Sequence, residues 1–505
     1  MPSPTIYQIH TRPWLRELAP GNGRPPTLNE VPDQALDAIA DLGMEWVWML
    51  GVWQTGPIGR SIARSVPELR SNFRSELPDL REDDILGSPF AIERYQAHKD
   101  LGGDAALARF RERLRVRGLR LMLDFVPNHT GPDCPWVVER PEFFVQGREE
   151  DLLRRPHDFR CVETVRGPAI IAHGKDPYFP SWTDTYQLCH QHAGLRAARV
   201  EELLSIAQRC DGVRCDMAML VLPDVFGRTW GELAAPADGS PPVTPSFWVE
   251  AIQRVRRAHP EFFFLAEAYW DLEWELQCQG FDATYDKTMY DRLRRRDAPA
   301  VRGHLHADPS YQRRSLRFLE NHDEPRAASV FDRPTHHAAA VIAGLVPGPR
   351  LYYEGQFDGR KVRPSVQLAR RPNEPLDAET RSFYVRLLAL SRRPDMDAGP
   401  WRLLECRAAW HENRSHEQFV AFLWKGPRTL LVAVNYGPMR GQCYVGTPLA
   451  EFAGRSVSLV DLLGPERYVR DGDDLLERGL YLDMPEWGHH VFEVAIDESP
   501  AATPG

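Results

Sequence analysis

Short apolar runs rich in β-branched and aromatic residues alternate with amphipathic helical segments from the N-terminus to about residue 393. This alternation is typical of a parallel sheet, in which each helix carries the chain back to the start of the next strand. Eight such runs are present, at residues 5–10, 44–50, 119–126, 212–218, 262–270, 281–286, 315–323 and 349–355. Eight strand–helix repeats are the number that closes a TIM barrel, so the sequence predicts an α/β chain with a (β/α)8 barrel.

Two connections are too long for plain barrel loops, and the chain changes character near its end. The connections span about residues 51–100 and 130–193, and the second predicts a small domain inserted after the third strand. Beyond residue 395, strand follows strand without helices, which predicts a C-terminal antiparallel β-sandwich domain. We therefore expect a barrel at 1–129 and 194–394, an inserted domain at 130–193, a C-terminal domain at 395–497 and a tail at 498–505.

The bulk composition excludes several classes of protein. A net charge of −9 argues against a general nucleic-acid binder, which is usually basic. No stretch approaches the ~18 apolar residues of a membrane span, and the N-terminus lacks the pattern of a secretory signal. Eight cysteines without a CxxC pair are typical of reduced thiols. We therefore expect a cytoplasmic protein with no nucleic-acid or membrane partner; the sequence leaves its oligomeric state open.

Charged and polar residues gather where the predicted strands end, which is where barrel enzymes place their active sites. The stretch GVRCD carries Arg214 and Asp216 two positions apart, so both side chains point to the same side of the strand. Burying such charges is costly unless they pair or act in a site. The ends of three other strands add further polar groups: Asp124, Asn128, His129, Glu267, Asn321, His322 and Asp323.

Three carboxylates without a Cys/His metal cluster suit the cleavage of a glycosidic bond. One carboxylate attacks the anomeric carbon, and a second protonates the leaving oxygen and later activates water. A third can stabilise the positive charge of the transition state. Arg214 would keep Asp216 ionised and oriented as a nucleophile. Around Glu267, the neighbours Phe264, Tyr269 and Trp270 predict an apolar wall that favours the protonated form.

Four stretches in order resemble the signature regions of the α-amylase family, glycoside hydrolase family 13. They are DFVPNH (124–129), GVRCD (212–216), FLAEAYW (264–270) and FLENHDEPR (318–326). The insertion and the β-rich C-terminus are similar to the family's domains B and C. The resemblance implies that Asp216 is the nucleophile, Glu267 the acid/base and Asp323 the transition-state stabiliser. It also implies substrate-binding roles for Arg214, beside the nucleophile, for His129 and His322, and for Phe90, which stands where a stacking Tyr is usual.

Two departures from the family pattern concern sugar and calcium binding. Leu220 and Val221 stand where many starch-cleaving members have Lys-His, which weakens the inference to long starch. Asn128 matches a calcium-binding position, but Cys189 stands where Asn is frequent. We therefore predict no metal site and no required cofactor, and calcium remains open.

The sequence predicts a retaining glycoside hydrolase that acts on α-glucosidic, first of all α-1,4, bonds of glucans or oligosaccharides. A transglycosylase or glucoside isomerase would use the same three carboxylates, because only the acceptor differs. A non-catalytic member of the fold that binds glucan or a partner protein is a third reading; retention of all three carboxylates argues against it.

Overall fold

A computed structural model describes residues 3–19, 23–396 and 399–500. The chain divides into two compact units. One comprises Ile6–Tyr285 and Val362–Asn373, and we call it the first unit. The other, the second unit, comprises Met1–Thr5, Asp286–Lys361 and Glu374–Gly505.

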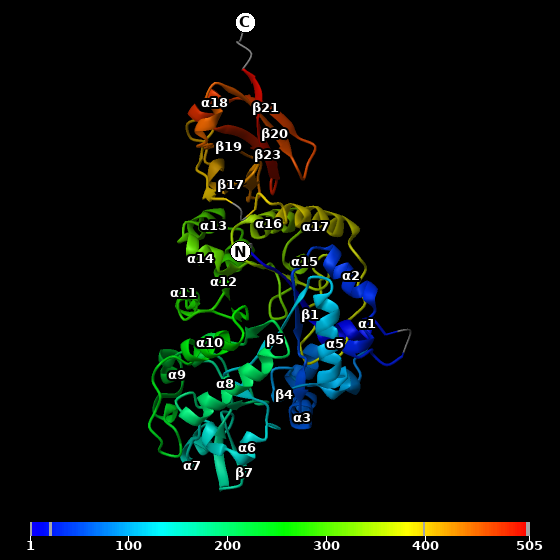
Figure 1. Ribbon diagram of the computed structural model, residues 1–505, viewed down its shortest axis with the longest axis vertical. Helices are drawn as coiled ribbons and strands as arrows, with labels where there is room; N and C mark the ends of the chain where they lie inside the picture. The colour runs from blue at the N-terminus through cyan, green and yellow to red at the C-terminus, as the bar shows by residue number, and fades with distance from the viewer. Residues whose placement is uncertain (1–2, 20–22, 397–398, 501–505) are drawn as a thin grey trace. The chain divides into compact units, whose positions relative to one another are not determined.

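Eight strands form the parallel sheet that the sequence predicts, in the order β13-β12-β11-β10-β5-β2-β1-β14. Figure 1 labels two of them, β1 and β5. An isolated parallel bridge between Arg317 and Arg350 links the two ends of this order, so the sheet closes into a (β/α)8 barrel. The strands are β1 (Thr5–His10), β2 (Trp46–Leu50), β5 (Arg120–Phe125), β10 (Gly212–Cys215), β11 (Phe263–Ala266), β12 (Ala283–Tyr285), β13 (Ser315–Leu316) and β14 (Arg350–Tyr353).

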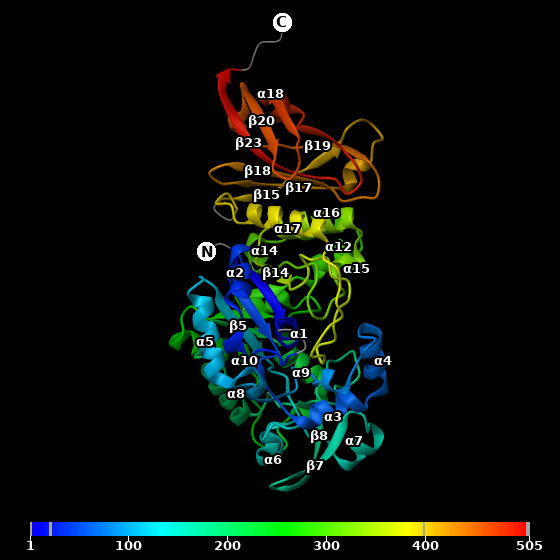
Figure 2. The same ribbon diagram turned by 90° about the vertical axis from the view of Figure 1, so that its right-hand side faces the viewer.

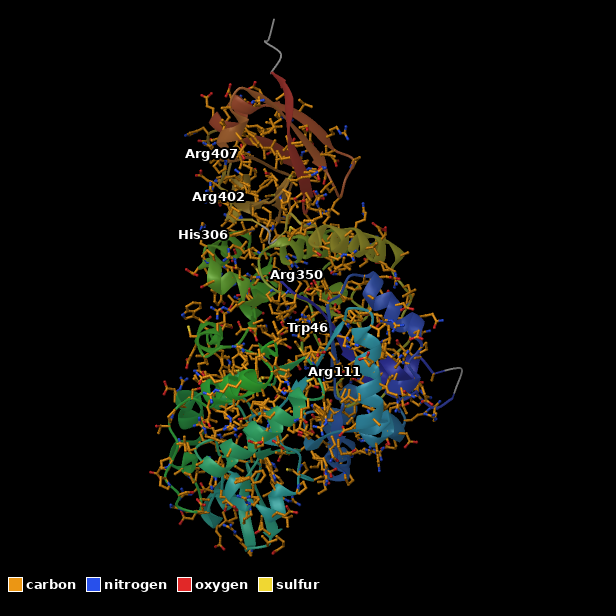
Figure 3. The ribbon with its side chains drawn as sticks, in the orientation of Figure 1. Trp46, Arg111, His306, Arg350, Arg402 and Arg407 are labelled. Carbon is orange, nitrogen blue, oxygen red and sulfur yellow. The ribbon has the colours of Figure 1, made fainter. Side chains whose placement is uncertain are left out.

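These strands are continuous apolar runs because helices cover one face of the barrel sheet and side chains fill the other. All five residues of β2 are buried, and so are all four of β10. Trp46, at the start of β2, packs against Phe263 with ring centroids 5.2 Å apart (Figure 3). In the register of the sheet Arg214 lies between Asp124 of β5 and Leu265 of β11. The register of the sheet therefore places the Arg214 cation next to the Asp124 carboxyl group.

The observed strands are shorter than the predicted runs at their carboxyl ends. The predicted runs 212–218 and 262–270 continue past Cys215 and Ala266, where β10 and β11 end. The residues that follow leave the regular ladder and carry the polar groups. Asp216 and Glu267 thus stand immediately beyond their strands.

Amphipathic helices connect the strands as the periodicity predicts. In α5 the buried Leu107, Phe110 and Leu114 recur at a spacing of three and four. The shortest of these helices is α11, with six residues. The main barrel helices are α2 (Asp33–Asp41), α5 (Gly103–Arg115), α8 (Ala193–Ala207), α10 (Phe247–Ala258), α11 (Glu273–Cys278), α12 (Lys287–Arg294), α13 (Ala298–Leu305), α16 (Arg333–Leu345) and α17 (Ala378–Ser391).

Both long connections contain structure of their own. The first holds β3 (Trp53–Thr55), α3 (Pro57–Ser65), α4 (Pro67–Glu76) and β4 (Ile92–Ala97). The second holds β6 (His129–Thr130), α6 (Trp136–Glu139), α7 (Glu149–Arg154), β7 (Phe159–Thr164), β8 (Gly167–Ala172) and β9 (Tyr186–Gln187). Phe143, Phe144, Ile171 and Leu188 form a buried cluster within the second connection. This segment therefore has a small buried cluster of its own, and its separation from the barrel as a domain stays a prediction.

The C-terminal region of the second unit consists of two antiparallel sheets. The larger has the order β15-β17-β18-β23-β20-β21 and the smaller β16-β19-β22. Helices α16 and α17 lie beside the larger sheet (Figure 2), and Trp424 Nε1 donates to the carbonyl of Leu345 over 2.7 Å. The strands are β15 (Trp401–Leu403), β16 (Cys406–Ala408), β17 (Phe419–Lys425), β18 (Thr429–Asn435), β19 (Gly441–Val445), β20 (Arg455–Asp461), β21 (Arg467–Asp471), β22 (Leu480–Met484) and β23 (His489–Pro500).

The predicted tail at 498–505 falls partly in β23. That strand continues to Pro500, which pairs with Arg455 of β20, and residues 501–505 lie outside the described residues. No helix among the described residues combines the length and the apolar character that crossing a membrane requires.

The second unit buries a histidine whose titration should make stability depend on pH. Burial lowers the pKa of His336 to about 4, and its Nε2 lies 2.8 Å from the Tyr384 hydroxyl. The unfolded chain binds this proton at pH 5, whereas the folded chain does not. The free energy of unfolding therefore falls as pH drops below the unfolded pKa of about 6.5. This one residue should remove about 1–2 kcal/mol between pH 7.5 and pH 5.

His336→Gln retains a polar side chain but cannot titrate, so we expect urea unfolding to show a shallower loss of stability over this pH range. His411→Gln is the matched control, because His411 is almost fully exposed. An equal pH slope in wild type and His336→Gln would contradict the assignment.

Candidate active site

Arg214 holds two carboxylates at the ends of β10 and β11. Its Nη1 lies 2.5 Å from Asp216 Oδ1 and its Nη2 lies 2.6 Å from Glu267 Oε2. All three side chains are buried. A guanidinium is planar and presents its donors in a fixed fork, so both carboxyl groups are confined to its edge. The structure thus brings together three of the residues that the sequence assigns to the site.

Glu267 receives two further hydrogen bonds. The backbone N–H of Met217 donates to Oε2 over 2.6 Å, and the Tyr269 hydroxyl donates to Oε1 over 2.9 Å. The prediction of an apolar wall around Glu267 is therefore wrong for Tyr269, which presents its hydroxyl to the carboxylate. Phe264 packs instead on Phe262, with ring centroids 5.2 Å apart. Together with Arg214 Nη2, three donors therefore converge on the Glu267 carboxylate.

The backbone around the two carboxylates is tied together across three strands. The N–H of Asp216 donates to the carbonyl of Phe125, and the N–H of Glu267 donates to the carbonyl of Cys215. Met217 then adopts a left-handed conformation with φ 41°, which is unusual for a residue with a side chain. This turn is what aims the Met217 N–H at Glu267. Local strain of this kind is held in place by the packing around it.

Asp124 supports the site from β5 as a hydrogen-bond acceptor. Its Oδ1 accepts from Trp48 Nε1 over 2.9 Å, and its Oδ2 accepts from the N–H of Gly51 over 2.8 Å. Burial raises the pKa of Asp124 to about 6, while the positive charge of Arg214 opposes that rise. These fixed bonds give Asp124 a structural role in the barrel.

Aromatic rings surround the Arg214 guanidinium. Its Cζ lies 5.3 Å from the ring centre of Phe90, 5.4 Å from that of Trp48 and 5.7 Å from that of Tyr285. Its Nε also donates to the Tyr285 hydroxyl over 3.3 Å. Phe90, predicted to stack on substrate, thus lies against the residue that holds both carboxylates. The rings keep water from the cation and strengthen its interactions.

His129 is buried beside this group, in the short strand β6. Burial lowers its pKa to about 4, and the negative charge of Asp216 opposes the shift. Its ring packs on Trp182 with centroids 5.2 Å apart. His129 is therefore neutral near pH 7 and can both donate and accept a hydrogen bond, as a ligand of sugar hydroxyls would.

His322 and Asp323 belong to the second unit, on the loop after β13. Asn321 Oδ1 accepts from the N–H groups of Asp323 and Glu324 over 2.8 and 2.9 Å. Asp323 Oδ2 lies 3.1 Å from His322 Nε2, and the Asp323 side chain is 43% exposed. The loop is thus fixed locally and presents a carboxylate. Its joint action with Asp216 and Glu267 stays a prediction from the sequence.

The residues expected to bear on calcium do not fit a calcium site. The side-chain amides of Asn128 and Gln187 bond each other, with Gln187 Nε2 donating to Asn128 Oδ1 over 2.9 Å. Cys189 offers sulfur, and its thiol donates to the carbonyl of Ala234 over 3.4 Å. Calcium prefers a shell of free oxygen ligands. Neither the bonded Asn128–Gln187 pair nor the Cys189 thiol offers such a shell.

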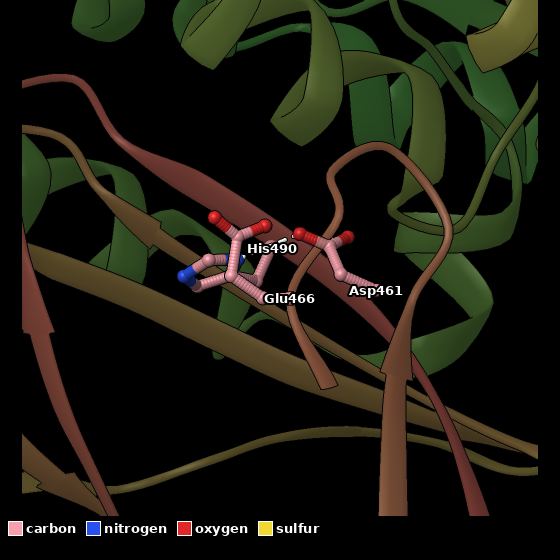
Figure 4. A group of neighbouring side chains, drawn as sticks. All are labelled: Asp461, Glu466 and His490. Atoms are coloured by element: carbon pink, nitrogen blue, oxygen red, sulfur yellow. Dashed lines mark hydrogen bonds and ion pairs between the residues drawn. The ribbon is translucent and has the colours of Figure 1, made fainter. Parts of the chain in front are cut away.

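Within the described part of the chain, one group of side chains has the spacing of metal ligands: Asp461, Glu466 and His490 (Figure 4). It belongs to the C-terminal sheets. Asp461 Oδ2 lies 2.7 Å from His490 Nδ1, and its Oδ1 accepts from the N–H groups of Leu463 and Val491. These bonds already account for the Asp461 carboxylate as a structural link between β20 and β23.

Sequence reasoning missed several groups that shape the site. Tyr285 is the last residue of β12. The signal that could have identified it is its place at the end of the strand next to β11. The hydrogen bond from the Met217 N–H could not be predicted from the sequence, because it depends on a left-handed turn at that residue. Trp48 lies in an apolar run, which predicts a core residue. Only the structure shows that its indole N–H donates to Asp124.

Comparisons with known proteins confirm the resemblance to α-amylases and the fold. No family model matches the sequence. The α-amylase MalA of Haloarcula japonica is 24% identical over 368 residues, 71% of this chain and 44% of MalA, so the chain spans less than half of that relative. A maltogenic α-amylase of Thermotoga neapolitana, AmyB, superposes with a TM-score of 0.69 at 18% identity, over 97% of this chain and 98% of AmyB. An α-amylase of Geobacillus thermoleovorans complexed with acarbose gives 0.65 at 16% identity, over 98% and 99%.

Arg214 is the cation that pairs with both buried carboxylates. Arg214→Met should lower the free energy of unfolding at pH 7.5 by about 3–5 kcal/mol, because it leaves buried carboxylates without their cation. The loss should shrink at pH 5, where an unpaired buried carboxylate takes up a proton. Urea unfolding at both pH values measures it.

The control adds Asp216→Asn and Glu267→Gln to Arg214→Met, which removes the uncompensated charge. This triple variant should regain most of the lost stability. Its remaining difference from wild type in the free energy of unfolding should be the same at pH 7.5 and pH 5. A triple variant as unstable as Arg214→Met would show that packing around the guanidinium, and not charge, sets the cost.

Proposed function

We propose that the chain is a retaining glycoside hydrolase that cleaves α-glucosidic bonds, first of all α-1,4 bonds, in glucans or oligosaccharides. The observation that carries the proposal is the pairing of Asp216 and Glu267 with the fork of one guanidinium. Retaining enzymes need their two carboxyl groups ~5–5.5 Å apart, whereas inverting enzymes leave room for a water molecule. Two carboxylates confined to one fork suit the closer arrangement.

In the proposed mechanism Asp216 attacks the anomeric carbon and forms a covalent ester with the glycosyl group. Glu267, protonated when substrate enters, gives its proton to the leaving oxygen. In the second step the ionised Glu267 takes a proton from water, which attacks the ester and releases a product of the original configuration. Asp323 would stabilise the positive charge of both transition states, with His129, His322 and Phe90 binding the sugar.

The protonated form of Glu267 has a physical source in the substrate complex. Asp216 and Glu267 are like charges that share one cation, so ionisation of one opposes ionisation of the other. Substrate would also displace water from the site and strengthen that repulsion. This repulsion would favour the protonated form of Glu267, against the three donors that bond its carboxylate.

The relatives support an enzyme of this class and leave its acceptor open. MalA is an α-amylase, and the Geobacillus enzyme is an α-amylase complexed with acarbose. A transglycosylase or isomerase would pass the glycosyl group to a sugar instead of water through the same ester. The eight cysteines are all free thiols, which supports our proposal of a cytoplasmic location.

Two substitutions separate the roles of the central carboxylates. Glu267→Gln should lose most activity on malto-oligosaccharides but still form the glycosyl-enzyme with α-glucosyl fluoride, whose leaving group needs no proton. Asp216→Asn should fail on both substrates, because no ester can form. Fluoride release and mass spectrometry of the intact protein measure the two steps.

Both changes are nearly isosteric, and thermal unfolding serves as the control for folding. Asp323→Asn should lower kcat/KM on both substrates, since it acts on both transition states. If Asp216→Asn still accumulates the ester, or if azide rescues Glu267→Gln with inverted product, the two roles must be exchanged.

The stereochemical outcome gives an independent test. Direct attack by Asp216 predicts that the first product formed has the α configuration. Proton NMR of early product, recorded before mutarotation, reads this directly. A β-anomer appearing first would require an inverting water mechanism and would remove the nucleophile role of Asp216.

A further inference from the structure

The loop that carries Asp323 in the second unit is closed at its base by a buried ion pair. Arg326 Nη1 donates to Glu320 Oε1 over 2.7 Å, and Glu320 Oε2 accepts from the backbone N–H of Ala327 over 2.6 Å. The side chains of Glu320 and Arg326 are both fully buried. One carboxylate thus ties the residue before the loop to the residues after it. We call residues 321–325 the Asp323 loop, and Glu320 together with Arg326 the loop clamp.

The same guanidinium fastens the loop to the neighbouring strand of the barrel. Arg326 Nη1 also donates to the backbone carbonyl of Glu354 over 2.9 Å, one residue beyond β14. Its Cζ lies 4.0 Å from the ring centre of Tyr353, the last residue of β14. A planar guanidinium that bonds a carboxylate and a carbonyl and also stacks on a ring is held in one orientation. The Asp323 loop is therefore anchored to the barrel as well as to itself.

Bonds inside the loop carry this anchoring to Asp323. Asn321 Oδ1 accepts from the backbone N–H groups of Asp323 and Glu324. Lys287, the first residue of α12, places its Nζ 3.3 Å from Glu324 Oε1. The residues on either side of Asp323 are thus fixed, and Asn321 and His322 are buried. The Asp323 carboxylate projects from a backbone that cannot easily shift.

The sheet cannot position Asp323 as it positions the other two carboxylates. Asp216 and Glu267 follow directly on the last residues of β10 and β11. β13 ends at Leu316, seven residues before Asp323. Ladder hydrogen bonds stop well short of the carboxylate, so its place depends on the contacts of the loop. The loop clamp supplies those contacts at both ends of the loop.

Stability alone does not explain a charged pair at this place. Moving two charges out of water is costly, and well-packed apolar residues of similar volume often stabilise a fold as well or better. What the pair does provide is geometry, because a charge-assisted hydrogen bond to a guanidinium is short and directional. A carboxylate that stabilises a transition state needs such geometry, since the energy of its charge depends steeply on distance inside a dry site.

We propose that Glu320 and Arg326 are positioning residues that hold Asp323 where it stabilises the positive charge of the transition state. The inference rests on the proposed function, because it takes Asp323 as the transition-state stabiliser. The loop clamp then acts on kcat through Asp323 and touches neither the substrate nor the reacting atoms.

The test removes both charges of the loop clamp together. Glu320→Gln combined with Arg326→Met keeps side chains of similar length and leaves no unpaired buried charge, so the variant should fold. With α-glucosyl fluoride its kcat should fall by about tenfold or more, because an error of about 1 Å in placing a group is that costly. KM should stay within about twofold, since the group acts in the transition state and not on bound substrate.

A double-mutant cycle shows whether the loss passes through Asp323. The same two substitutions, made in the Asp323→Asn background, should lower kcat further by less than about twofold. A merely structural role would give the same factor in both backgrounds. Rates of fluoride release measure all four corners of the cycle.

Hydrogen exchange of the peptide covering residues 320–327 gives a readout that is independent of catalysis. The N–H groups of Asp323 and Glu324, which are bonded to Asn321, should exchange faster when the loop clamp is removed. Thermal unfolding checks that the rest of the chain stays folded.

Glu379→Gln is the matched control. It breaks another carboxylate–guanidinium pair of the second unit, between Arg333 and Glu379, whose atoms lie 2.6 Å apart but whose side chains are exposed. It should change neither the exchange of the loop nor kcat. Glu320→Gln alone covers the case in which the double variant folds poorly. Its amide nitrogen cannot accept the second of the two bonds, so the same cycle with Asp323→Asn should show a smaller loss of the same kind.

The outcomes separate the two proposals. An unchanged kcat, an equal loss in both Asp323 backgrounds, or unchanged exchange of the loop overturns the positioning role while the proposed function stands. A wild-type protein that releases no fluoride from α-glucosyl fluoride overturns the proposed function, and with it the positioning role.

Discussion

One buried cation organises the first unit at the carboxyl ends of its strands. Arg214 pairs with Asp216 and Glu267, and in the sheet register it stands beside Asp124. A buried guanidinium is tolerated only when its donors and its charge are matched, and a buried carboxylate has the same requirement. The two carboxylates could not be buried without Arg214, and Arg214 could not be buried without them. Charge balance therefore ties β5, β10 and β11 to one arrangement.

Some residues of this site lie on regular strands, and others lie on the irregular backbone that follows the strands. Regular strands place Asp124 and Arg214, since neighbouring registers in a parallel sheet fix which side chains meet. The other two donors to Glu267, besides Arg214, come from irregular backbone: Met217 with its left-handed turn, and Tyr269 just beyond β11. Strain is thus confined to the residues that follow the strands. The closed barrel below them supplies the rigidity that holds it.

Most of the barrel could be predicted from the sequence because its strands are apolar runs separated by amphipathic helices. Each of the eight runs contains a strand of the barrel sheet, and helices lie between them. The sequence overestimated the lengths of β10 and β11, since apolar residues continue past the last ladder hydrogen bond. Arg214 was recognisable because a charge in an apolar run needs a partner, and alternation placed Asp216 on the same side.

The partners of Glu267 could not be read from the sequence in the same way. Tyr269 reads as an apolar neighbour, and only its position in space shows that its hydroxyl donates to the carboxylate. The residue types next to a carboxylate in the sequence therefore predict poorly how polar its surroundings are when one of them, like Tyr, carries a hydroxyl.

Under the proposed mechanism the charge on Arg214 is redistributed as the reaction proceeds. Before attack the guanidinium is shared by Asp216 and Glu267, and neither carboxylate has its full attraction. Formation of the ester consumes the charge of Asp216, so the repulsion on Glu267 disappears and the attraction of Arg214 acts on Glu267. Both changes favour the ionised form. Glu267 therefore becomes a base at the step that needs one, and Arg214 has not moved. Hydrolysis of the ester restores the charge of Asp216 and with it the tendency of Glu267 to take up a proton. The fixed fork of one arginine is enough to couple the two protonation states through the whole cycle.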